Sequence, residues 1–129
     1  MNQSAPNFVD VNELLLHAAA AGDVHLALTA IDRGASPNCR DPRGLTPLMR
    51  AATYDNVEML QLLIDAGAEI DAATEHHVTA LMRAAIHDRI AAAQELLRCG
   101  AATDLRDEDG FTAKEIANRL GNKGVAAVL

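Results

Sequence analysis

The residues best suited to chemistry lie together in the stretch TEHHVTA at positions 74–80. Glu75, His76 and His77 are adjacent there, and His87 follows further along the chain. Imidazole and carboxylate groups are common metal ligands, and imidazole also titrates near neutral pH. The stretch could therefore hold a metal, form a pH-sensitive contact, or be an ordinary loop. Because zinc sites generally need three or four converging ligands, the elements that position these residues decide among the three.

Other arrangements typical of enzymes are not found in the sequence. The phosphate-binding pattern G-x-x-x-x-G-K-(S/T) does not occur. The acidic residues at 104–109 form a short charged run, which is typical of a solvated loop. Cys39 and Cys99 stand far apart without a C-x-x-C pair, so they suggest neither a disulfide framework nor a zinc site. We therefore expect a non-enzymatic protein without a cofactor.

The composition limits the fold and the class of partner. A chain of 129 residues with 50% hydrophobic residues suits one compact domain, and only 2% of the residues are aromatic. An aliphatic core of this kind favours packed helices. The net charge of -7, without a basic cluster, argues against nucleic-acid binding. No apolar run is long enough to span a bilayer, and the N-terminus does not resemble a secretory signal. We expect a monomeric, cytoplasmic protein that binds neither nucleic acid nor membrane.

A repeat of 33 residues organises the chain. GLTPLMRAATYDN at 44–56 aligns with HVTALMRAAIHDR at 77–89, and the same offset relates Thr46, Thr79 and Thr112. Periods of this length are typical of solenoids, in which each unit packs against the next. Within a unit the pattern predicts a turn, a short helix, a tight turn and a longer helix. The threonine is the expected N-cap of the short helix.

The signature T-P-L-x-x-A-A at 46–52, with G-A-x-x-(N/D) about twenty residues later, resembles the ankyrin repeat. The resemblance covers roughly residues 10–129. It implies an all-α, ankyrin-type α-solenoid of helix-turn-helix repeats joined by β-hairpin loops. The outer repeats look like the polar caps that a solenoid needs for solubility. The expected boundaries are an N-terminal tail at 1–9 and repeats at 10–40, 41–73, 74–106 and 107–129.

Some positions depart from the family pattern. Met49 and Met82 stand where the family usually has His, which predicts apolar packing in place of a polar network between repeats. Asp55 and Asp88 stand where Gly usually ends the first helix. Asp tolerates a left-handed backbone better than most residues, so we expect this conformation there with some loss of stability. His77 likewise replaces a turn glycine, and we expect a left-handed backbone at this residue.

The resemblance also implies a binding surface. Ankyrin repeat stacks bind proteins through the hairpin tips and first helices, which together form a concave face. We therefore expect a protein–protein interaction module that acts as adaptor, inhibitor or scaffold. The alternative is a small metal- or ligand-dependent protein that uses the region of His76, His77 and His87. Carried over residue by residue, the expected partner contacts are Arg43, Leu45, Arg50, Tyr54, His76, Val78, Arg83, His87 and Phe111.

Three patterns stand out among these contacts. The residue after each turn glycine position is apolar, at Leu45, Val78 and Phe111, which indicates either an apolar stripe or packing between hairpins. Tyr54, the only tyrosine, lies one helical turn after Arg50, and both types are enriched at interface hot spots. Alternatively, Tyr54 covers the neighbouring repeat. The tip of the second repeat is basic, with Arg40 and Arg43, and the tip of the last repeat is mostly acidic, with Asp107, Glu108 and Asp109. This gradient either orients a partner or reflects ordinary loop charge.

Overall fold

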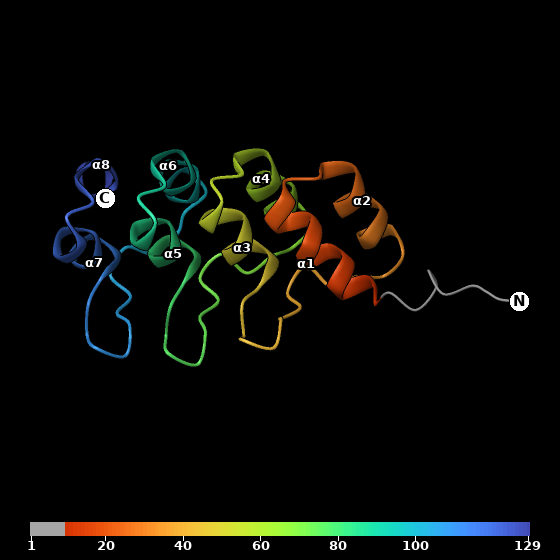
Figure 1. The fold of residues 1–129 in the computed structure, drawn as a ribbon, viewed down its shortest axis with the longest axis horizontal. Coiled ribbons are helices and arrows are strands. Elements are labelled where there is room, and N and C mark those ends of the chain that lie inside the picture. The colour runs from red at the N-terminus through yellow and green to blue at the C-terminus, as the bar shows by residue number, and fades with distance from the viewer. Residues whose placement is uncertain (1–9) are drawn as a thin grey trace, which may run out of the picture.

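The computed structural model describes residues 10–129, where the chain forms eight helices in four consecutive pairs. The expected tail at 1–9 lies outside the described residues. The pairs stack in one row, with first helices along one side and second helices along the other (Figure 1). This is the all-α solenoid that the sequence predicted. The helices are α1 (Val11–Ala21), α2 (Val24–Asp32), α3 (Pro47–Thr53), α4 (Val57–Asp65), α5 (Ala80–Ile86), α6 (Ile90–Arg98), α7 (Ala113–Leu120) and α8 (Lys123–Val128).

The predicted threonine caps are confirmed. The side-chain oxygens of Thr46, Thr79 and Thr112 each accept a hydrogen bond from the backbone N–H three residues later, at 3.2, 3.3 and 3.3 Å. In the last repeat, Glu115 reaches back to the backbone N–H of Thr112 at 2.9 Å and completes a capping box. These bonds satisfy N–H groups that the first turn of a helix leaves without partners.

The first helices of neighbouring repeats pack through small and flexible apolar residues. The alanine pairs at 51–52 and 84–85 are fully buried, which allows adjacent helices to approach closely. Met49 and Met82 are also almost completely buried, as the sequence predicted. The thioether sulfur of Met49 accepts a hydrogen bond from the Thr46 N–H at 3.4 Å. Apolar packing has thus replaced most of the polar network expected for a histidine.

The loops between repeats fold back at tips that two backbone hydrogen bonds close. In the second repeat, the Asp41 N–H donates to the Leu45 carbonyl at 2.9 Å, and the Gly44 N–H donates to the Asp41 carbonyl at 2.8 Å. The same pair of bonds recurs at 74–78 and at 107–111, and we call the three loops the second, third and fourth tips after their repeats. The tips therefore share one geometry and project from the row of first helices (Figure 1).

The fourth residue of each tip has a left-handed backbone. Its φ angle is 83° at Gly44, 63° at His77 and 88° at Gly110, which confirms the expectation for His77. The loops follow the course of hairpins but form almost no β-sheet pairing. Within residues 10–129 there is no β-strand, and one isolated antiparallel bridge joins Ala73 to Thr79.

Asp55 and Asp88 adopt the expected left-handed backbone, with φ angles of 61° and 55°. Each carboxylate also accepts a hydrogen bond from the next repeat, Asp55 from the Ala92 N–H at 2.8 Å and Asp88 from the Val125 N–H at 3.0 Å. These N–H groups lie in the first turns of α6 and α8, whose own N-cap side chains form no cap. The aspartates therefore cap helices of the following repeat, which offsets the expected loss of stability.

A second set of side chains, also spaced by 33 residues, ties each repeat to the one before it. Asn56, Arg89 and Asn122 donate to carbonyl groups at the end of the preceding first helix, over distances of 2.8–3.2 Å. The final carbonyls of a helix have no partner within the helix, so these bonds satisfy groups that would otherwise need water.

Candidate protein-binding face

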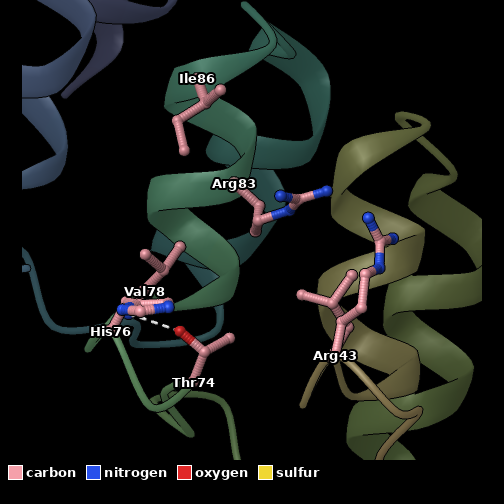
Figure 2. Close-up of a pocket in the computed structure, with 7 residues that line it drawn as sticks. Arg43, Thr74, His76, Val78, Arg83 and Ile86 are labelled. Atoms are coloured by element: carbon pink, nitrogen blue, oxygen red, sulfur yellow. Dashed lines mark hydrogen bonds between the residues drawn. The ribbon is translucent and has the colours of Figure 1, made fainter.

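Seven of the nine predicted contact residues line two adjoining pockets on the side of the tips. The first pocket has a volume of about 200 Å³ and the second about 100 Å³. We call the two together the groove. The first is lined by Arg43, Leu45, Thr74, His76, Val78, Arg83 and Ile86 (Figure 2), and the second by Ala20, Arg43, Leu45, Arg50, Thr53, Tyr54 and Arg83.

Ala20 is a lining residue that the sequence interpretation missed. It occupies the same place in its repeat as Thr53 and Ile86, so the offset of 33 residues could have identified it. Thr74 was also missed as a contact. It starts the third tip, where its hydroxyl accepts a hydrogen bond from the Val78 N–H at 3.2 Å.

Arg50 is held by an ion pair at one wall of the groove. Its guanidinium donates to a carboxylate oxygen of Asp41 at 2.8 Å, and the Asp41 side chain is only 3% exposed. Burial favours a higher pKa for Asp41, but hydrogen bonds from Arg50 and from the backbone of Leu45 and Arg43 outweigh it, and the pKa is lowered. Arg50 therefore anchors the second tip, and its charge is already compensated.

The second tip presents Arg43 from a rigid turn. The other carboxylate oxygen of Asp41 accepts from the Arg43 N–H at 2.8 Å and from the Leu45 N–H at 2.9 Å. Leu45 is only 6% exposed and belongs to the core, although it forms part of the groove floor. Among the apolar contacts, packing between the hairpin and the core thus accounts for Leu45.

Arg83 reaches across the groove from α5. Its Nε donates to the Thr53 hydroxyl at 2.9 Å, and Figure 2 shows the Arg83 and Arg43 side chains extending toward each other. Burial, followed by the nearby charge of Arg43, lowers the pKa of Arg83. Within residues 10–129, neither guanidinium forms an ion pair with a carboxylate. The centre of the groove is therefore basic, in a chain whose net charge is -7.

Tyr54 lies at the edge of the groove, where α3 ends. It is 56% exposed, so more than half of its surface is accessible to solvent. This exposure disfavours the alternative that Tyr54 mainly covers the neighbouring repeat.

His76 bridges the third and fourth tips. Its Nδ1 lies 2.7 Å from a carboxylate oxygen of Glu108, and its carbonyl accepts from the Glu108 N–H at 3.0 Å. The hydrogen bond with Glu108 and then its charge raise the pKa of His76. No group of three or more metal-ligating side chains is assembled within residues 10–129. The structure therefore does not bring His76, His77 and His87 together as a metal site.

Two predicted contacts lie away from the groove. His87 is exposed at the end of α5 and lines neither pocket. Phe111 lies in the last repeat, packed partly against the core, and the Arg119 guanidinium sits 4.3 Å from the centre of its ring. Phe111 and Val78 are each partly buried, so packing accounts for much of the predicted apolar stripe.

Most of the charged side chains in the predicted gradient along the tips form hydrogen bonds or ion pairs with the loops. Arg40 donates to the carbonyls of Gly44 and Ala73 at 2.9 and 3.0 Å. In the last tip, Asp107 accepts from backbone N–H groups of its own turn, and Glu108 pairs with His76. Most of these charges therefore support the loops, but the guanidinium of Arg43 forms no hydrogen bond or ion pair within residues 10–129.

A third pocket lies on the opposite side, between α2 and α4. It has a volume of about 470 Å³, and its lining combines apolar residues with two acidic residues and one glutamine. Its lining consists of Val24, Leu28, Ile31, Glu58, Gln61, Leu62, Asp65 and Ala66. None of the predicted contacts lies there.

Comparison with protein families agrees with this architecture. Residues 14–107, more than half of the chain, match the family described as ankyrin repeats in three copies. The match leaves α7 and α8 beyond its end. No curated protein matches the chain.

None of the helices α1 to α8 is long and apolar enough to cross a membrane. Ankyrin repeats are generally protein–protein interaction modules and are typically not enzymes. The chain belongs to the ankyrin repeat family.

Proposed function

We propose that this protein binds a partner protein through the groove on its concave face, as an adaptor, inhibitor or scaffold without enzymatic activity. One observation carries the proposal: the half-exposed Tyr54 and the unpaired Arg43 and Arg83 converge on one groove between neighbouring repeats. The proposal includes a monomer in the cytoplasm, where the free thiols of Cys39 and Cys99 would stay reduced.

Tyrosine and arginine dominate the residues whose loss weakens protein interfaces most. A tyrosine supplies a large contact area with few rotatable bonds, and its hydroxyl adds a polar contact. The second tip is rigid because Asp41 closes it and Arg50 anchors it. A preorganised surface loses little conformational entropy on binding, which favours affinity.

The test is the substitution Tyr54→Ala. We expect the affinity for a partner isolated with the wild-type chain to fall by about 2 kcal/mol, the range of a hot spot. The measurement is isothermal titration calorimetry, with circular dichroism to verify the fold. Leu120→Ala is the matched control, because Leu120 is also 56% exposed but lies on α7 away from the groove.

Equal affinities for wild type and Tyr54→Ala would contradict the proposal. Arg50→Ala is a poor substitute for this test, because it would leave the buried Asp41 carboxylate unpaired and destabilise the tip itself.

A further inference from the structure

The centre and the ends of the groove differ in their charge balance. At the ends, Arg50 is paired with Asp41 and His76 with Glu108. At the centre, Arg43 is exposed and its guanidinium forms no hydrogen bond or ion pair within residues 10–129. The Arg83 guanidinium, half buried, is bonded there only through its Nε. Two positive charges from neighbouring repeats thus share a pocket without a counter-charge.

Two like charges in one pocket repel each other, and an anionic group bound between them would relieve this repulsion. Like charges repel more strongly near a protein surface than in bulk water, because the effective dielectric constant is lower. A guanidinium group is planar and presents paired donors that match a carboxylate, so two of them facing one space suit an anionic group between them. Residues 10–129 do not supply one, because Asp41 is already bound to Arg50 and Glu75 lies outside the groove lining.

The same pocket has an apolar side. Leu45, Val78 and Ile86 line it next to the two arginines. Its volume of about 200 Å³ is below the range of about 300–1,000 Å³ usual for small-molecule sites. The size therefore favours one or two side chains of an extended segment over a cofactor or metabolite.

We propose that the groove binds an acidic segment of the partner protein, with an Asp or Glu carboxylate between Arg43 and Arg83 and a neighbouring aliphatic side chain against Leu45, Val78 and Ile86. This inference rests on the proposed function and adds the chemistry of the bound segment. Arg43 and Arg83 supply the charge that selects the segment, while Tyr54 supplies contact area at its edge.

The test is selection from a random-sequence peptide display library on three proteins. These are the wild type, the groove variant Arg43→Gln/Arg83→Gln and the control Arg33→Gln/Lys123→Gln. The control removes the same net charge from two exposed positions outside the groove. We expect wild type and control to enrich peptides in which Asp or Glu neighbours Leu, Ile or Val. The groove variant should lose this preference while keeping the circular dichroism spectrum and thermal midpoint of the control.

One enriched peptide then serves as a defined probe in fluorescence polarisation. Its affinity should fall at least about tenfold on the groove variant, a change of about 1.4 kcal/mol. Replacing the peptide's carboxylate residue by its amide should cost wild type a similar factor. The two losses should not add when combined, because both remove the same interaction. The reversed variant Arg43→Glu/Arg83→Glu should in turn select basic peptides, which a merely misfolded groove would not do.

Enrichment of neutral or basic peptides by wild type, no enrichment at all, or equal binding of an acidic peptide to the groove variant would overturn the inference. If neutral or basic peptides selected on wild type lose affinity for the Tyr54→Ala variant, the proposed function survives. Only the inference that the bound segment is acidic is then wrong. If no peptide responds to Tyr54→Ala either, both fail. Self-association of wild type that the groove variant abolishes would make a second copy the occupant, which also overturns the inference.

Discussion

His77 has a left-handed backbone with a φ angle of 63°, in a position that glycine fills in the other two tips. A residue with a Cβ atom pays about 1–2 kcal/mol for this conformation. The His77 side chain forms no hydrogen bond or ion pair within residues 10–129. Its imidazole therefore offers little to offset the backbone strain, unlike the carboxylates of Asp55 and Asp88.

We predict that His77→Gly is neutral or stabilising, by up to about 1 kcal/mol, because the relief of strain exceeds the entropy that glycine adds to the unfolded chain. Urea denaturation measures the change in the free energy of unfolding. Gly44→Ala is the matched control and should be destabilising, because Gly44 has a φ angle of 83° in the equivalent place. Clear destabilisation by His77→Gly would mean that the imidazole stabilises the tip in a way that the contacts do not explain.

Among the helices and loops, the sequence predicted the features that form within a single repeat. The threonine caps and left-handed turn positions depend on residues a few places apart, and each recurs with the offset of 33 residues. Contacts between residues further apart in the chain were not predictable in the same way. The pair of Arg50 with Asp41 and the bond from Ala92 to Asp55 depend on how the tip and helices pack in space.

The contact between Asp55 and α6 gives a second prediction. Asp55→Ala should destabilise the protein by about 1–2 kcal/mol, because it removes the cap of the next repeat and keeps the left-handed strain. Asp55→Asn is the matched control and should cost less, because the amide oxygen can still accept from the Ala92 N–H and Asn tolerates the left-handed conformation. The free energy of unfolding in urea compares the two, and equal losses would show that the cap contributes little.

At the scale of the whole molecule, the stack places tips and first helices on one face, and the groove follows from their spacing. Seven of nine predicted contacts line it, because the family pattern fixes which positions of a repeat face that side. The sequence could not show which of their charges are already paired. Arg50 differs from Arg43 and Arg83 in its carboxylate partner, Asp41, which the fold brings within 2.8 Å of its guanidinium. The three arginines have the same side chain, but Arg50 is already paired with Asp41, whereas Arg43 and Arg83 form no ion pair within residues 10–129.

Mapping where a partner binds shows whether it occupies the groove. Backbone amide signals of the isotope-labelled chain can be followed by NMR during titration with a peptide selected on wild type. We predict that the largest changes fall at Arg43, Tyr54 and Arg83, with the amides of α2 and α4 unchanged. Changes confined to the pocket between α2 and α4, around Leu28 and Leu62, would mean that the partner binds there and not in the groove.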